Sequence, residues 1–258
     1  IYCFKPKLII MKKQMILYVF SLMSITAISQ SKWFISFETG YGFGGPLGSI
    51  EKNMEKSNLN QHSPAIDFFG LVFNGSDYPK KTAGIPTLLK VGKRLKEGRS
   101  VYIEAGVSNR GEVVGFQNIG SYGNTIRVNY LVGQFTAGYQ YSFAKSRSKV
   151  GWGPSLFLLQ YKDDYKALSH HNYSSFVPGI SAMTRVPMGK EKHLLGVELV
   201  AELNAAPPAK MKEIQKTSYT LDYNGSRSNY TSTLKASQVN MLHGMVGLAL
   251  SVRSKSKK

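Results

Sequence analysis

The sequence predicts an all-β fold, namely a closed, antiparallel transmembrane β-barrel of eight strands that follows an N-terminal signal peptide. Two observations support this prediction: eight segments alternate apolar with polar residues, and the connections between them alternate between short and long. A period of two sends successive side chains to opposite faces of a strand. In a membrane barrel, one of these faces meets lipid and the other meets a polar lumen.

Residues 131–143 show the alternation best. One face carries Leu131, Gly133, Phe135, Ala137, Tyr139, Tyr141 and Phe143, and the other carries Gln134, Thr136, Gly138, Gln140 and Ser142. The same pattern predicts strands at about 33–44, 84–95, 100–107, 127–143, 148–161, 174–187, 192–203 and 238–253.

The connections fall into two kinds. Tight turns are expected at 96–99, 144–147 and 188–191, and longer loops at 45–83, 108–126, 162–173 and 204–237. Outer-membrane barrels have short periplasmic turns and long extracellular loops, so this order is the one expected for eight strands. In the last loop, Asn224-Gly225 predicts a hairpin that extends strands seven and eight beyond the membrane. Ten strands remain an alternative if residues 65–73 and 113–119 pair as an extra hairpin; residues 65–73 could also form a plug.

The N-terminal region predicts export. Residues 1–10 precede a better start site, Met11-Lys12-Lys13 gives a basic segment, and 15–25 gives an apolar one, with cleavage expected before Gln30. We therefore expect residues 1–29 to be removed and 30–258 to form a single barrel domain with a basic C-terminal tail. A membrane anchor is the alternative, although its apolar run is shorter than the ~20 residues that a spanning helix needs.

A soluble eight-stranded barrel or β-sandwich is the alternative fold. Its apolar face would point inward and would crowd a narrow core with aromatic rings. The opposite face carries many glycines and small residues, which suit the crowded interior of an eight-stranded barrel. The sequence therefore favours the membrane barrel.

Charge and cysteine content limit the kinds of binding partner and cofactor that are expected. The single cysteine, Cys3, lies in the leader, and loss of four leader lysines lowers the formal charge from +18 to +14. A basic surface favours anionic partners such as lipopolysaccharide phosphates or an acidic membrane surface. No nucleic-acid-binding motif is present, so nucleic acid is not an expected partner. No cofactor and no metal are expected, and we expect a monomer.

Charged residues also occupy the predicted lumen face. The expected charge network consists of Glu38, Lys90, Arg94, Glu104, Arg185, Glu198, Glu202 and His243. Charges inside a narrow barrel must be paired, because a desolvated lone charge is costly. The 97–99 turn places Lys90 diagonal to Glu104 and Arg94 opposite Tyr102, and we expect Glu198 or Glu202 to reach Arg185 or His243. A proton path or gated pore lined by Glu198, Glu202 and His243 is the alternative.

The loops offer two further candidate sites. The third loop holds Asp163, Asp164, Ser169, His170 and His171, which could bind a divalent metal or form a hydrolase site, although a solvated polar loop is the preferred interpretation. The first and last loops are rich in basic residues that are expected to lie at one end of the barrel. These are Lys52, Lys56, Lys80, Lys81, Lys210, Lys212, Lys216, Arg227 and Lys235.

With this leader, these eight segments and this turn–loop order, the chain resembles the small outer-membrane β-barrel proteins of the OmpA-transmembrane-domain and OmpX type over about residues 31–253. Such barrels commonly end in an aromatic residue, whereas strand eight here ends at Leu250-Ser251-Val252-Arg253. The resemblance implies a protein of the outer membrane of a Gram-negative-type cell. We expect a non-enzymatic barrel with a structural or surface-binding role; a lipid A-modifying enzyme and a narrow channel are the alternatives.

Overall fold

The computed structural model describes residues 32–61, 78–95, 98–119, 122–163, 172–189, 195–221 and 226–253. The predicted leader at 1–29, the apolar patch at 65–73 and the Asn224-Gly225 turn lie outside these residues. Within the described part, no helix is long and apolar enough to span a bilayer.

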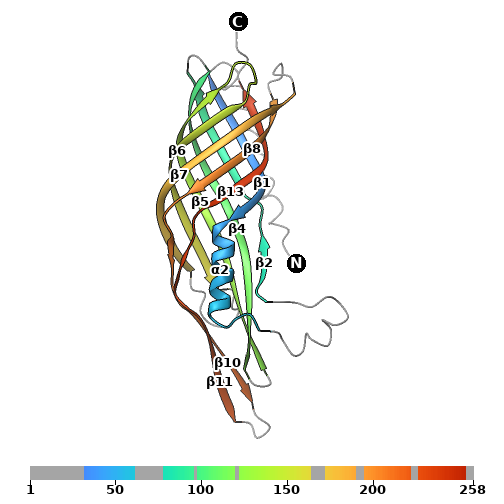
Figure 1. Ribbon diagram of the computed structural model, residues 1–258, viewed down its shortest axis with the longest axis vertical. Coiled ribbons are helices and arrows are strands. Elements are labelled where there is room, and N and C mark those ends of the chain that lie inside the picture. The colour runs from blue at the N-terminus through green and yellow to red at the C-terminus, as the bar shows by residue number, and fades with distance from the viewer. Residues whose placement is uncertain are drawn as a thin grey trace, which may run out of the picture.

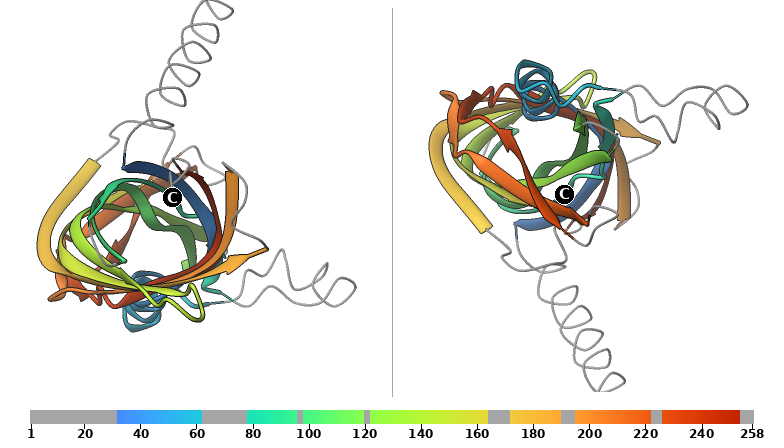
Figure 2. Two further views of the ribbon diagram at one scale, coloured as in Figure 1. Left: turned by 90° about the horizontal axis from the view of Figure 1, so that it is seen from above. Right: turned by 90° about the horizontal axis from the view of Figure 1, so that it is seen from below.

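Eight antiparallel strands close into a ring, as the alternation predicts. Each strand pairs with the next, and β1 pairs with both β3 and β13, which closes the sheet on itself. Figure 2 shows the ring along the barrel axis. The strands are β1 (Trp33–Gly44), β3 (Thr87–Arg94), β4 (Arg99–Ile119), β5 (Tyr122–Ser142), β6 (Lys149–Asp163), β7 (Asn172–Met188), β8 (Leu195–Ala205) and β13 (His243–Arg253).

The wall of the ring is apolar outside and polar inside. Large apolar side chains such as Ile103, Phe135 and Trp152 are exposed on the outer face, whereas Lys90 and Glu38 are fully buried in the interior. A soluble barrel would place these two sets the other way round. The chain is therefore a transmembrane β-barrel, and the soluble alternative is excluded.

The prediction of a loop at 108–126 is wrong, because β4 and β5 run on as a long hairpin that pairs from Arg99↔Tyr141 to Ile119↔Tyr122. A β-bulge between Val107 and Asn109 reverses the alternation of β4, so the strand does not show a single period of two. Residues 113–119 therefore belong to β4 and add no ninth strand to the ring.

The first and last connections carry more structure than the single hairpin that the sequence predicted. The first forms helix α2 (Gly45–Lys56), with Pro46 in its first turn where a missing N–H costs nothing, and strand β2 (Lys80–Ala83), which pairs with β4. The last forms β9 (Ala209–Met211), β10 (Ile214–Leu221), β11 (Arg227–Leu234) and β12 (Ser237–Val239). Figure 1 shows α2 and the β10–β11 hairpin beyond the same end of the ring.

The predicted hairpin exists, but it does not continue strands seven and eight. Strands β10 and β11 form their own two-stranded sheet, and β9 pairs with β12. Strand β8 ends at Ala205, just before Pro207-Pro208, and proline has no N–H for a ladder hydrogen bond. The last barrel strand accordingly begins at His243 and not at 238.

Candidate functional site

The centre of the lumen is an ion-pair cluster around Lys90. Its Nζ lies 2.5 Å from Glu104 Oε2 and 3.3 Å from Glu38 Oε1, and 4.4 Å from the ring centroid of Tyr102. Lys90 and both carboxylates are fully or almost fully buried. The two carboxylates compensate the ammonium group for its removal from water.

A second cluster lies nearer the tight turns and is centred on Arg185. Its Nη1 lies 3.3 Å from Glu198 Oε2 and donates to Ser36 Oγ at 3.1 Å, while Nη2 contacts Glu38. Lys149 also pairs with Glu198. Glu38 therefore joins the two clusters, so ion pairs link strands β1, β3, β4, β6, β7 and β8 across the lumen.

The register corrects two details of the predicted network. Lys90 lies directly opposite Glu104 and not diagonal to it, and Arg94 pairs with Ser100 and not with Tyr102. Arg94 is only half-buried and lines a hollow of about 220 Å³ at the turn end, together with Arg99 and Lys149. Lys149 thus stands in the buried network where Arg94 was expected.

Glu202 and His243 occupy a different level from Glu198 and do not contact each other in the described structure. Gln134 Nε2 donates to Glu202 Oε1 at 2.6 Å and to Glu104 Oε1 at 3.0 Å. His243 Nε2 lies 2.9 Å from Ser108 Oγ, and its Nδ1 lies 2.9 Å from the Met241 carbonyl. The expected pairing of Glu198 with Arg185 is present, whereas neither acid pairs with His243.

A hydroxyl and amide cluster beside Glu202 was missed by the sequence analysis. Ser155 Oγ lies 2.8 Å from Thr136 Oγ1 and 2.7 Å from Ser181 Oγ, which donates to Asn204 Oδ1 at 2.5 Å. These side chains lie at the inward positions of their strands, where they alternate with glycines. The period of two could therefore have identified them as lumen residues. They fill the lumen with hydrogen-bonded groups.

The three carboxylates nearest Lys90 form the one group of possible metal ligands in the described residues. Oxygens of Glu38, Glu104 and Glu202 lie within 4.8 Å of one another. The Lys90 ammonium already contacts two of these acids, and the Gln134 amide contacts two as well. The cluster thus contains a cation of its own, and its residues are arranged as an ion-pair network and not as an open coordination shell.

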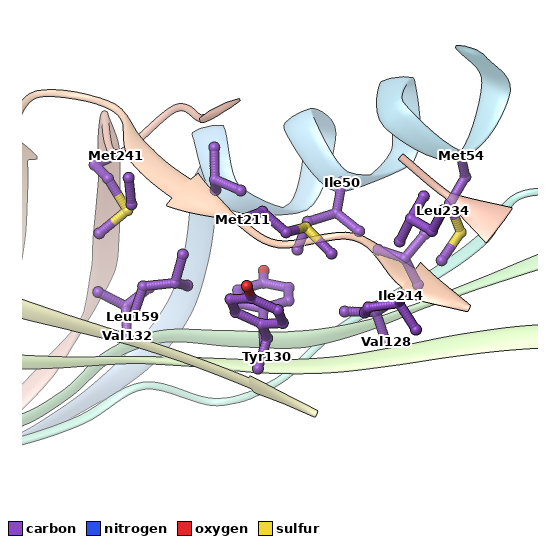
Figure 3. Packing of buried hydrophobic residues seen from close by; sticks show 14 of the residues in the cluster. Ile50, Met54, Val128, Tyr130, Val132, Leu159, Met211, Ile214, Leu234 and Met241 are labelled. Atoms are coloured by element: carbon purple, nitrogen blue, oxygen red, sulfur yellow. The ribbon is translucent and has the colours of Figure 1, made fainter. Parts of the chain in front are cut away.

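A buried apolar cluster, called here the apolar cap, lies at the end of the lumen opposite the tight turns. Figure 3 shows Ile50 and Met54 of α2 facing Val128 and Tyr130 of β5, with Met211 between them. Ile214, Leu234 and Met241 belong to the same buried cluster. Asn53 Nδ2 donates to the Lys235 carbonyl at 2.8 Å, and the Lys235 N–H donates to Ser57 Oγ at 3.2 Å, which fastens α2 to the end of β11.

The hydrolase or metal site considered for the third loop lies outside the described residues, since 164–171 and the side chain of Asp163 are not described. The only Ser–His hydrogen bond in the described part is that of Ser108 with His243, and both side chains are 1 % exposed inside the barrel. The His243 ring also packs edge-on against Phe157 of the buried apolar cluster, with the ring centroids 5.3 Å apart.

Comparison with known proteins gives similarity at the level of the fold. No family model and no curated protein matches the sequence. The chain is similar to the solved Neisserial surface protein A, with 9% identity, a TM-score of 0.39, and coverage of 86% of this chain and 97% of that one. For the outer membrane protein OprG from Pseudomonas aeruginosa the values are 10%, 0.43, 87% and 98%. For the outer membrane protein AlkL in lipid bilayers they are 15%, 0.38, 88% and 93%.

Proposed function

We propose that the protein is a non-enzymatic barrel of the outer membrane whose lumen is sealed and whose extracellular end binds anionic surface material. The closed ring of eight antiparallel strands supports placing it with the small barrels of the OmpA and OmpX type. The outward apolar wall supports residence in a bilayer, and the predicted leader supports export.

The observation that carries the proposal is the filled lumen. Lys90, Glu38, Arg185 and Glu198 are at most 1 % exposed, and their ion pairs run from strand to strand across the interior. The apolar cap then covers the extracellular side of the same channel. An eight-stranded barrel is just wide enough for side chains to fill it, so a sealed interior favours a structural or binding role over conduction.

Conductance in planar bilayers tests the sealed lumen. The wild-type barrel should insert without opening a stable ion-conducting level at either polarity. The matched positive control is Lys90→Ala with Glu104→Ala, which empties the central layer while conserving its net charge and should leak more than the wild type. Steady single-channel currents through the wild-type protein would refute the proposal.

The binding surface that we propose lies on the basic extracellular elements. Lys52 and Lys56 are exposed on α2, and Lys210 and Lys235 are exposed on the returning segment. The hydrogen bonds between α2 and Lys235 bring these two segments together. Other cations of the predicted set have contacts of their own, such as Lys81 with Glu51 at 3.0 Å and Arg227 over the Tyr219 ring at 4.0 Å.

Salt-dependent binding to lipopolysaccharide tests this surface. Replacing Lys52, Lys56, Lys210 and Lys235 with glutamine should weaken binding at low salt, and the difference should shrink as ionic strength rises, because charges separated by more than about 8–10 Å are screened. The control is Lys145→Gln, in the tight turn at the opposite end. Binding that is absent, or equal in all three proteins, would refute this role.

A further inference from the structure

The outer wall of the barrel changes from apolar to polar between two adjacent cross-strand rows. The last apolar row runs across β4 to β7, and in the next row along the strands every residue except Leu131 is polar. The apolar row is Val107, Gly133, Leu158 and Phe176, and the polar row is Arg110, Leu131, Gln160 and Ser174. Asn129 and Lys162 pair directly in the row beyond. This change marks the level at which lipid tails give way to headgroups.

The β-bulge directs Arg110 to the outer face at this level. Ser108 and Asn109 are consecutive, and both are buried inside, at 1 % and 3 % exposed. Arg110 therefore points outward on the same face as Val107, although residues three apart on a regular strand face opposite sides. The stem of Arg110 passes over Gly84, where an added Cβ would lie 2.6 Å from its Cγ. Without the extra residue at the bulge, the alternation along β4 would place Arg110 in the lumen.

A groove of about 490 Å³ opens along these two polar rows. Arg110, Asn129, Leu131, Gln160, Lys162 and Ser174 line it, together with three tyrosines. Its side chains offer two cations, two amides and a hydroxyl, and no acid is among the described residues that line it. Glu112, which pairs directly with Asn129 in the second of these rows, is held by Arg127 Nε at 2.8 Å. The groove therefore presents positive charge directly above the lipid-facing wall.

We propose that this groove binds the phosphate of an outer-leaflet lipid headgroup, with the acyl chains lying along Leu158 and Phe176 below it. Guanidinium and ammonium groups donate strong charge-assisted hydrogen bonds to phosphate oxygens. The amides and the hydroxyl of the groove supply donors for the remaining oxygens and the sugar of a glycolipid. This site deepens the proposed function and rests on it, since the wall must stand in a membrane, but it is separate from the loop lysines.

Native mass spectrometry of the full-length barrel in a zwitterionic detergent tests the site, with lipid A and dephosphorylated lipid A as probes. The wild-type protein should bind lipid A more tightly than the dephosphorylated form. Arg110→Gln with Lys162→Gln should weaken lipid A binding by roughly 25-fold, at about fivefold per cation near a charged surface. The same variant should bind dephosphorylated lipid A as the wild type does.

The matched control is Lys145→Gln with Arg147→Gln, which removes two exposed cations from the turn at the other end and should leave lipid A binding unchanged. If the double wall variant folds poorly, Lys162→Gln alone should show the fivefold loss. Equal affinity of the wall variant and the wild type, or no preference for the phosphorylated lipid, would overturn the proposal. Displacement of lipid A by millimolar inorganic phosphate would also overturn it, by assigning the groove to free phosphate. The loop-lysine variant measured alongside reports on the proposed function separately.

Discussion

Removing the central cation is the sharpest test of the ion-pair network. Lys90 is completely buried, and its ammonium contacts Glu104 at 2.5 Å and Glu38 at 3.3 Å. Lys90→Met keeps an unbranched side chain of similar volume, so the change removes charge without opening a large cavity. It leaves two buried carboxylates without their shared cation, and breaking a buried pair in this way costs about 3–5 kcal/mol.

Urea unfolding in detergent micelles measures this loss, with Trp152 as the probe because its indole is exposed on the lipid-facing wall. At a slope of about 2–3 kcal/mol per M, the midpoint should fall by roughly 1–2.5 M. Lys90→Met with Glu104→Gln should recover part of the loss, since one of the stranded charges is then removed.

Lys93→Met is the matched control, because Lys93 lies three residues further on the same strand but is exposed on the outer face. Its midpoint should stay within the ~0.5 kcal/mol that is usual for surface substitutions. A Lys90→Met barrel that unfolds at the wild-type midpoint would refute the reasoning that the lumen acids depend on this cation.

Three further predictions follow from close packing, from burial and from the bulge. Gly247→Ala should destabilise the barrel in heat-modifiability gels, because the added Cβ would lie 2.1 Å from the Thr39 carbonyl oxygen, whereas Gly48→Ala in α2 meets no atom within 4 Å and should be neutral or stabilising. Burial lowers the pKa of Lys216, so the unfolded hairpin binds more protons than the folded one and the stability of the fold rises with pH. The β10–β11 hairpin should therefore resist proteolysis better as the pH rises toward 10.5, and Lys216→Gln should lose this trend. Deleting Ser108 should open the cap to proteases by turning Val113 outward, whereas Ser108→Ala keeps the register and should not.

The barrel could be predicted from the sequence because its signal is repeated in every strand. Phe37, Ile103 and Leu250 each follow the outward period of their own strand, and all three are exposed on the wall. The extension of β4 and β5 could not be read in the same way, because the bulge shifts the period in the middle of β4. Helix α2 was missed because it is short, with only about three turns inside a polar loop, although Leu47, Ile50 and Met54 lie at helical spacing.

The candidate site was predictable as a set of inward positions but not as a set of partners. Alternation places Lys90, Glu104 and Glu198 on the lumen face, and they are buried there. Partners depend on register, which a turn of uncertain length leaves open by two residues, and this is the error in the Lys90–Glu104 pairing. Lys149 has the inward parity of Gly151 and Gly153 and lies in the predicted strand 148–161, yet it was not included in the predicted lumen network.

Strand β5 has an apolar outer face and a polar inner face in one part of its length, and the reverse arrangement in the other. In the part of β5 nearer the tight turns, Phe135 faces outward, and Gln134 and Thr136 face the lumen. In the part nearer the apolar cap, Arg127 faces outward, while Val128 and Tyr130 are buried under the cap. Lipid surrounds the first part, so polar groups are satisfied inside it, and water surrounds the second, so apolar groups are buried there. The sequence of the strand therefore determines the level at which the outer face changes from apolar to polar. Arg110 and Lys162 stand at that level, which is where a lipid phosphate would meet them.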